Sequence, residues 1–119
     1  MNEEFFHQFN QAFFQGDRQF IENYIAEDIV WTMVGAESIV GKQAFLDAAF
    51  GINEGYTGMN YSTELSLVGK KGAALTGKMS RKGEDGTEKV YTYCDLYEVD
   101  DAKDSKIKTL ITFVIESTD

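Results

Sequence analysis

The hydrophobic positions of this chain follow a helical period in its first half. Over residues 3–15, 18–25 and 42–50, apolar side chains recur three and four residues apart, the spacing of an amphipathic helix packed on one face. Gly16 is suited to end the first helix and Asp17 to cap the second. The pattern predicts a tight pair of helices at the start and a third helix further along.

The period changes to two in the second half. The strand period is found over 61–68, 73–81, 90–99 and 106–116, and turn residues separate these stretches, which predicts four antiparallel strands. Both faces of 90–99 are largely apolar, which is typical of an interior strand. A β-rich run at 29–34 predicts one further strand between the second and third helices. Together these elements predict an α+β fold, with three N-terminal helices packed on a curved, mainly antiparallel sheet.

The strand predicted over 90–99 carries an acid on an aromatic face. Because side chains alternate along a strand, Tyr91, Tyr93, Asp95, Tyr97 and Val99 share one face. If that face looks into the core, the carboxyl group of Asp95 is costly to ionise. We therefore expect Asp95 to be hydrogen-bonded, protonated near neutral pH, or turned toward a cavity. The alternative is a purely structural carboxylate paired with a neighbouring tyrosine or backbone amide.

Large aromatic and thioether side chains are the candidates for lining such a cavity. Trp31, Tyr61 and Tyr93 are of special interest, because an indole N–H and two hydroxyls would supply polar contacts in an apolar pocket. The same side chains could equally fill the core. The predicted ligand-binding residues are Phe9, Trp31, Met33, Phe45, Phe50, Met59, Tyr61, Tyr93 and Tyr97.

Composition narrows the classes of partner. The 119 residues suffice for one domain, and 20 acidic against 11 basic side chains give a net charge of −9. This charge repels nucleic acid and anionic lipid, so neither is an expected partner. With one cysteine and one histidine, His7, the chain lacks the residues for a disulfide or a cysteine and histidine zinc site. We expect no metal and no cofactor, and, since the start lacks signal-peptide features, a cytoplasmic protein. His7 is expected at the side of its helix or in solvent.

Three short motifs resemble a known superfamily. They are FFQGD at 13–17, YIAEDIVW at 24–31 and GKQAF at 41–45, in the order and spacing that precede four strands. The chain is similar in this respect to the nuclear transport factor 2-like superfamily. The resemblance implies a single SnoaL-like domain over 1–119 with the cone-shaped, cystatin-like fold of ketosteroid isomerases and SnoaL-like polyketide cyclases.

The resemblance also implies which catalytic positions are kept. The helix-one tyrosine of the isomerases falls on Phe9, and their general-base aspartate falls on Met33, so neither group is present. The protonated aspartic acid on the central strand falls on Asp95, which is present. A steroid-type isomerase is therefore not expected. What remains is similar to SnoaL-like cyclases, which implies one catalytic pocket acid, Asp95.

The expected function is therefore binding of a small hydrophobic or aromatic molecule. If the protein is an enzyme, the implied reactions are isomerisation, cyclisation or dehydration next to a carbonyl group. The alternative is a non-catalytic dimeric module for ligand binding or association.

The outer face of the sheet is the expected site of self-association. Relatives in this superfamily commonly dimerise through that face, so the resemblance implies a homodimer. We expect a mixed surface there, which is either solvated or a polar dimer interface, made of Ser62, Glu64, Ser66, Thr76, Lys78, Ser80, Thr92, Cys94 and Leu96.

Overall fold

Three helices form where the helical period predicts them. A computed structural model describes residues 1–51, 58–100 and 106–117, and contains α1 (Glu3–Gln15), α2 (Arg18–Tyr24) and α3 (Lys42–Phe50). Gly16 ends α1 in a left-handed conformation, φ 74°, which glycine adopts without strain. The Asp17 side chain caps α2 by accepting the Phe20 N–H at 3.2 Å. No helix of the described residues has the length and apolar character needed to cross a membrane.

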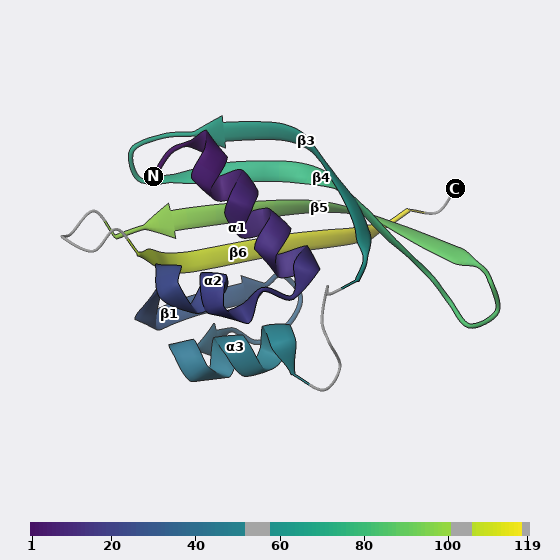
Figure 1. Cartoon of the computed structure of the whole chain (residues 1–119), viewed down its shortest axis with the longest axis horizontal. Helices are drawn as coiled ribbons and strands as arrows, with labels where there is room; N and C mark the ends of the chain where they lie inside the picture. Colours follow the sequence, from purple (N-terminus) through teal and green to yellow (C-terminus); the bar gives the residue numbers. More distant parts are fainter. Residues whose placement is uncertain (52–57, 101–105, 118–119) are drawn as a thin grey trace.

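Six strands form one mixed sheet in the order β2-β1-β6-β5-β4-β3. The last four make the predicted antiparallel meander, and β1 adds to its edge in parallel with β6. Figure 1 shows the helices on one face of this sheet and the paired ends of β4 and β5 extending past them. The strands are β1 (Ile25–Met33), β2 (Ile39–Val40), β3 (Asn60–Val68), β4 (Gly72–Lys82), β5 (Glu88–Val99) and β6 (Ile107–Glu116).

The start of the sheet differs from the prediction. β1 begins at Ile25, directly after α2, because Ile25 already pairs with Ile107 of β6. Residues 39–40, for which no strand was predicted, form β2, in which Ile39 and Val40 pair back onto β1. Two strands therefore precede α3, and only α1 and α2 are N-terminal to the whole sheet.

The core lies between the helices and the sheet and is rich in aromatic rings. α1 lies across the meander, while α3 packs on β1 (Figure 1). Phe9 is fully buried and contacts Phe13 and Tyr97 at ring-centroid distances of 5.8 and 5.6 Å. The fully buried apolar side chains are Phe6, Phe9, Ile21, Ile29, Phe45, Leu75 and Ile107.

A β-bulge in β3 changes the outer face. The register of β3 against β4 shifts between Thr63 and Leu65, which turns Leu65 and Leu67 outward. Ser66 consequently faces α1, where its hydroxyl donates to Glu3 Oε2 at 2.9 Å. The placement of Ser66 on the outer face is therefore wrong.

A second register shift, in the β5–β6 pair, changes which side chains of β6 face outward. The register against β5 shifts between Val99 and Glu98, so that Thr109 pairs with Glu98 while Ile107 pairs with Val99. Beyond this point Leu110 and Thr112 are buried under the helices, whereas Phe113 and Ile115 are exposed. The outer face is thus more apolar than the expected mixed surface. Its exposed large apolar side chains are Leu65, Leu67, Leu96, Phe113 and Ile115.

Candidate functional site

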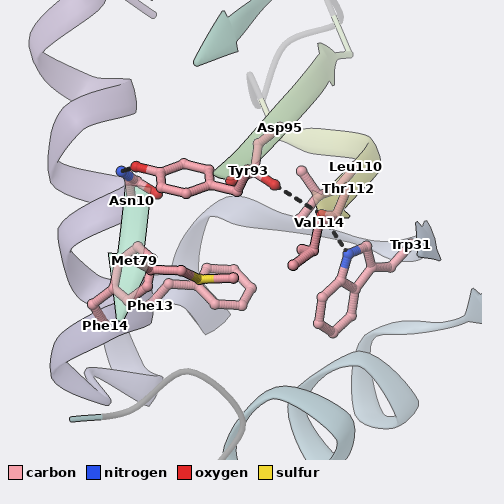
Figure 2. A pocket seen from close by; sticks show the side chains of 10 residues that line it. All are labelled: Asn10, Phe13, Phe14, Trp31, Met79, Tyr93, Asp95, Leu110, Thr112 and Val114. Atoms are coloured by element: carbon pink, nitrogen blue, oxygen red, sulfur yellow. Dashed lines mark hydrogen bonds between the residues drawn. The ribbon is translucent and has the colours of Figure 1, made fainter. Parts of the chain in front are cut away.

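Asp95 lies at a small cavity between α1 and the inner face of the sheet. The cavity has a volume of about 20 Å³, enough for about one water molecule. Figure 2 shows its side chains converging from α1, β1, β4, β5 and β6. The lining residues are Asn10, Phe13, Phe14, Trp31, Met79, Tyr93, Asp95, Leu110, Thr112 and Val114.

A directed chain of hydrogen bonds ends on Asp95. The Trp31 indole Nε1–H donates to Thr112 Oγ1 at 3.0 Å, and the Thr112 hydroxyl donates to Asp95 Oδ1 at 2.8 Å (Figure 2). An indole N–H can only donate, so the Thr112 hydroxyl accepts from it with one lone pair and its own proton is available to donate to the carboxyl group. Oδ1 of Asp95 is therefore an acceptor in this arrangement, and Oδ2 is the oxygen on which a proton can reside.

Strand pairing fixes this chain. Thr112 lies directly opposite Asp95 in the antiparallel β5–β6 pair. Trp31 pairs with Leu110 in the parallel β1–β6 pair, two residues along β6 from Thr112 on the same face. Three neighbouring strands thus hold the indole, the hydroxyl and the carboxyl group in line, and α1 covers them.

The environment raises the pKa of Asp95. Burial among apolar side chains raises this pKa from 3.8 to about 7, while the hydrogen bond from Thr112 acts in the opposite direction. The side chain is half-buried and lines the cavity, so a small molecule or water can reach it. Both the protonated and ionised forms of Asp95 are therefore populated near neutral pH.

A second polar cluster closes the other side of the cavity. Asn10 is buried on α1, and its Nδ2 donates to Tyr93 Oη at 3.0 Å. Tyr93 in turn donates to the Ser62 carbonyl oxygen at 3.1 Å. The ring reaches across β4 at Gly77, where a Cβ atom would collide with the Ser62 carbonyl and lie 2.8 Å from Tyr93 Oη. Glycine at 77 is therefore required for this contact.

The buried tyrosines stay neutral at neutral pH. Burial raises the pKa of Tyr93 and raises that of Tyr97 further, and the nearby Asp95 carboxylate adds to both shifts. Among the side chains lining the cavity, Asp95 is the one whose pKa lies near 7. Proton transfer in this cavity would involve that carboxyl group.

A larger open groove lies next to the cavity. Its volume is about 490 Å³, and Met79 and Val114 line both hollows. The groove lies on the inner face of the β4–β5 pair. The ends of these two strands extend past the helices (Figure 1). Its lining residues are Met33, Met59, Met79, Arg81, Lys82, Gly83, Lys89, Tyr91 and Val114.

The structure brings some of the predicted site residues together and separates others. Trp31 and Tyr93 line the cavity with Asp95, and Met33 and Met59 line the groove. Their binding roles stay predictions.

The other predicted residues do not line the cavity at Asp95. Tyr61 lines a shallow third hollow and stacks on Phe14 at a centroid distance of 4.3 Å. Four further residues pack in or against the core and line none of these three hollows: Phe9, Phe45, Phe50 and Tyr97.

Two polar residues of the cavity were not predicted from the sequence. Asn10 occupies the position four residues after Phe6 on the buried side of α1, and an amide at a helix position of this kind signals an internal polar contact. Thr112 alternates with Leu110 and Val114 on β6, but the apolar residues at 111, 113 and 115 concealed that face.

The remaining candidate groups form no further cluster at the cavity. His7 is half-buried, and its Nε2 lies 3.2 Å from Ser66 Oγ on β3. Over residues 1–51, 58–100 and 106–117, no group of three or more histidine, cysteine or acidic side chains is arranged to hold a metal ion.

Comparison with known proteins gives one family and several similar folds. The family model described as a SnoaL-like domain matches residues 6–108. No curated protein matches the chain. An NTF2-like protein of unknown function from Cytophaga hutchinsonii superposes with a TM-score of 0.78 at 21% identity, covering 95% of this chain and 98% of the other.

Two similar structures carry names that point to an activity. An LEH-like epoxide hydrolase from M. tuberculosis has a TM-score of 0.75 at 15% identity, with 94% of this chain and 80% of the other covered. A ketosteroid isomerase-like protein from Erwinia carotovora atroseptica has a TM-score of 0.66 at 17% identity, with 97% and 94% covered. At these identities the likeness concerns the fold alone.

Proposed function

Because the chain belongs to the SnoaL-like domain family, we propose that it binds a small, apolar, carbonyl-containing molecule with Asp95 as the anchoring acid. The domain would span the whole chain, 1–119, with the sheet and helices forming a cone-shaped, cystatin-like pocket. No cofactor is needed for this role, and we expect it to be carried out in the cytoplasm.

The observation that carries the proposal is the state of Asp95. Its pKa is raised to about 7, and its Oδ1 is already an acceptor for Thr112. A protonated Oδ2 is then a hydrogen-bond donor beside a cavity of about one water molecule. A ligand carbonyl oxygen is similar in size to a water molecule and can accept a hydrogen bond from protonated Oδ2.

The ligand would occupy both the cavity at Asp95 and the adjacent groove. The cavity is too small for a ring, so the ligand body would lie in the 490 Å³ groove against Met33, Met59 and Tyr91. The carbonyl group would pass between Met79 and Val114 to reach Asp95. The unbranched Met79 side chain can change rotamer at low cost to widen this passage.

Any catalysis would consist of proton transfer next to the carbonyl group. Protonated Asp95 would stabilise an enol or enolate by donating to its oxygen, and ionised Asp95 would accept a proton from the adjacent carbon. Isomerisation, cyclisation and dehydration all include such a step. Asp95 would be the catalytic residue.

Binding can be tested through the single tryptophan. We would titrate the protein with a panel of aromatic, polyketide-like and steroidal ketones and follow Trp31 fluorescence, because Trp31 lines the cavity. The proposal predicts that at least one ketone changes the emission and that Asp95→Asn lowers the affinity for that ketone. Equal binding by both proteins would contradict the role of Asp95.

Catalysis can be tested with any ketone that binds. In D2O, an enolising enzyme incorporates deuterium next to the carbonyl group, which NMR detects without knowledge of the natural substrate. Asp95→Asn should abolish the exchange while leaving the fold intact. Binding without exchange would favour the non-catalytic alternative.

A second candidate function, a dimeric association module, is favoured by the outer face of the sheet. Phe113 and Ile115 are 39% and 69% exposed there, and Leu65 and Leu67 lie on the same face. Several large apolar side chains exposed on one face of a sheet favour a protein interface there. We therefore expect a homodimer formed through this face, with or without ligand.

A further inference from the structure

The groove beside the Asp95 cavity carries a cluster of positive charge. Arg81 and Lys89 are cross-strand partners on β4 and β5, and Lys82 follows Arg81 in the chain. All three are exposed and line the groove. The chain as a whole has a net charge of −9, so the charged side chains that line the groove have the opposite sign to the net charge of the protein.

Strand alternation places two of these cations on the same face as the apolar floor. Met79 pairs with Tyr91, and Arg81 pairs with Lys89 two residues further out. Apolar side chains therefore lie nearer the cavity, and charged side chains lie at the far end of the groove. This is the distribution that an elongated ligand with one apolar and one charged end would match.

Neighbouring acids offset part of this charge. The Asp85 carboxylate interacts electrostatically with Lys89, and Glu88 lies opposite Lys82 in the β4–β5 pair. Glu116 lies opposite Tyr91 on β6, and its carboxylate is 4.0 Å from Lys89 Nζ. Both side chains are more than half exposed, so the pair is weak and can rearrange around a ligand. The lining of the groove itself includes three cations and no acid among the described residues.

We infer that the ligand is an amphipathic organic carboxylate, with its apolar body on Met79 and Tyr91 and its carboxylate at Arg81 and Lys89. This inference rests on the proposed function and names the chemical class of the ligand. The planar guanidinium of Arg81 can pair with both oxygens of a carboxylate, and Lys89 adds a point charge.

The spacing also restricts the length of the ligand. Lys89 and Asp95 are six residues apart on β5, which corresponds to roughly 20 Å along a strand. The cationic side chains can lean toward the cavity, so the carbonyl oxygen and the carboxylate are separated by less than this, about 15 Å. A biaryl or fused-ring acid has this reach, whereas a short keto acid does not.

A matched pair of ligands tests the charge requirement. The probes are 4′-acetylbiphenyl-4-carboxylic acid and its neutral carboxamide, which differ in charge and share the ketone and both rings. Isothermal titration calorimetry would compare their Kd values at low and high salt. We expect the acid to bind about fivefold more tightly than the amide, with the difference reduced at high salt.

Variants on the two faces of β4–β5 locate the effect. Arg81→Gln and Lys89→Gln should each raise the Kd of the acid about two- to fivefold and leave the Kd of the amide unchanged. Glu116→Gln should lower the Kd of the acid, because it removes a negative charge next to Lys89. The matched control is Lys78→Gln, because Lys78 lies on the outer face of β4 and pairs with Glu64 at 4.0 Å, as Lys89 does with Glu116.

The outcomes separate this inference from the proposed function. Equal Kd values for acid and amide, both dependent on Asp95, would overturn the carboxylate assignment and leave the proposed function standing. An equal loss in Lys78→Gln would overturn it too, since the effect would then be one of overall charge. If neither probe binds the wild-type protein, the assignment fails, and the ketone panel decides whether the proposed function fails with it.

Discussion

The inner face of β5 is divided into two regions that differ in packing. At one end Tyr97 packs against Phe6 and Phe9, with ring centroids 5.3 and 5.6 Å away, and the space is filled. At the other end Tyr93 and Asp95 border a cavity and make directed hydrogen bonds. We refer to these as the ring region and the Asp95 region.

The difference between the two regions separates stability from function. The ring region buries large apolar area and has no ionisable acid among its core residues, so it stabilises the fold. In the Asp95 region a half-buried acid with a raised pKa, together with an unfilled volume, lowers stability, and polar networks take the place of packed rings. Local instability of this kind is typical of functional sites. Removing a ring from the ring region should therefore destabilise the fold, whereas removing the acid from the Asp95 region should stabilise it above neutral pH.

The largest effect is expected in the ring region. Phe9→Ala should lower the free energy of unfolding by about 3 to 5 kcal/mol, because it removes a fully buried ring and leaves a cavity. Urea unfolding followed by circular dichroism would measure the loss. Phe9→Leu, which keeps most of the volume, should lose much less. A loss below about 1 kcal/mol for Phe9→Ala would contradict the assignment of this region as the structural core.

Asp95→Asn should have the opposite sign. The folded-state pKa of Asp95, about 7, is above its ordinary value of 3.8. Between these values the folded protein holds a proton that the unfolded chain releases, so stability is full below pH 4 and falls as the pH rises to 7. Asp95→Asn removes this cost. The difference in free energy of unfolding between variant and wild type should therefore shift in favour of the variant by about 2 to 4 kcal/mol between pH 4 and pH 8. Thermal melting across pH 4–8 checks this, and a parallel loss of stability at both pH values would oppose it.

Thr112→Val tests the link between the strands. The variant removes the donor to Asp95 and leaves the Trp31 indole N–H without its acceptor, so we expect a loss of about 1 to 2 kcal/mol. The hydrogen bond from Thr112 lowers the pKa of Asp95, and this pKa should therefore rise further in the variant. Thr109→Val, on the same strand beside Glu98, is the control and should leave the Asp95 titration unchanged.

The smallest effect on monomer stability is expected outside both regions. Ile115→Lys changes a side chain that is 69% exposed on the outer face, so the fold should lose less than about 0.5 kcal/mol. If this face forms the homodimer, light scattering at micromolar concentration should show a dimer for the wild type and a monomer for the variant. A wild-type monomer would remove the dimer proposal.

The elements that depend on local pattern could be predicted from the sequence. Helices over 3–15 and 42–50 match α1 and α3, because glycine and capping residues mark their ends in the chain itself. The inward orientation of Asp95 also followed from alternation, since β5 pairs on both sides and Tyr93 and Tyr97 are buried beside it.

The features that depend on register could not be predicted. A β-bulge shifts alternation by one residue, and neither the one near Thr63 nor the one near Ile107 leaves a local signal in composition. For that reason Ser66 was assigned to the wrong face. Thr112 was missed because the apolar residues at 111, 113 and 115 concealed the buried face of β6. The parallel pairing of β1 with β6, which brings Trp31 to Thr112, joins segments about 80 residues apart and is set by tertiary packing.

The most direct test of the account is a pH titration of the Trp31 indole N–H signal by NMR. The chain has one tryptophan, so the signal is unambiguous, and its proton is donated to the hydroxyl that donates to Asp95. We predict a change in chemical shift with a midpoint near pH 7 in the wild type, retained in His7→Gln and absent in Asp95→Asn. A midpoint near pH 4, or a titration that persists in Asp95→Asn, would contradict a proton held on Asp95 at neutral pH.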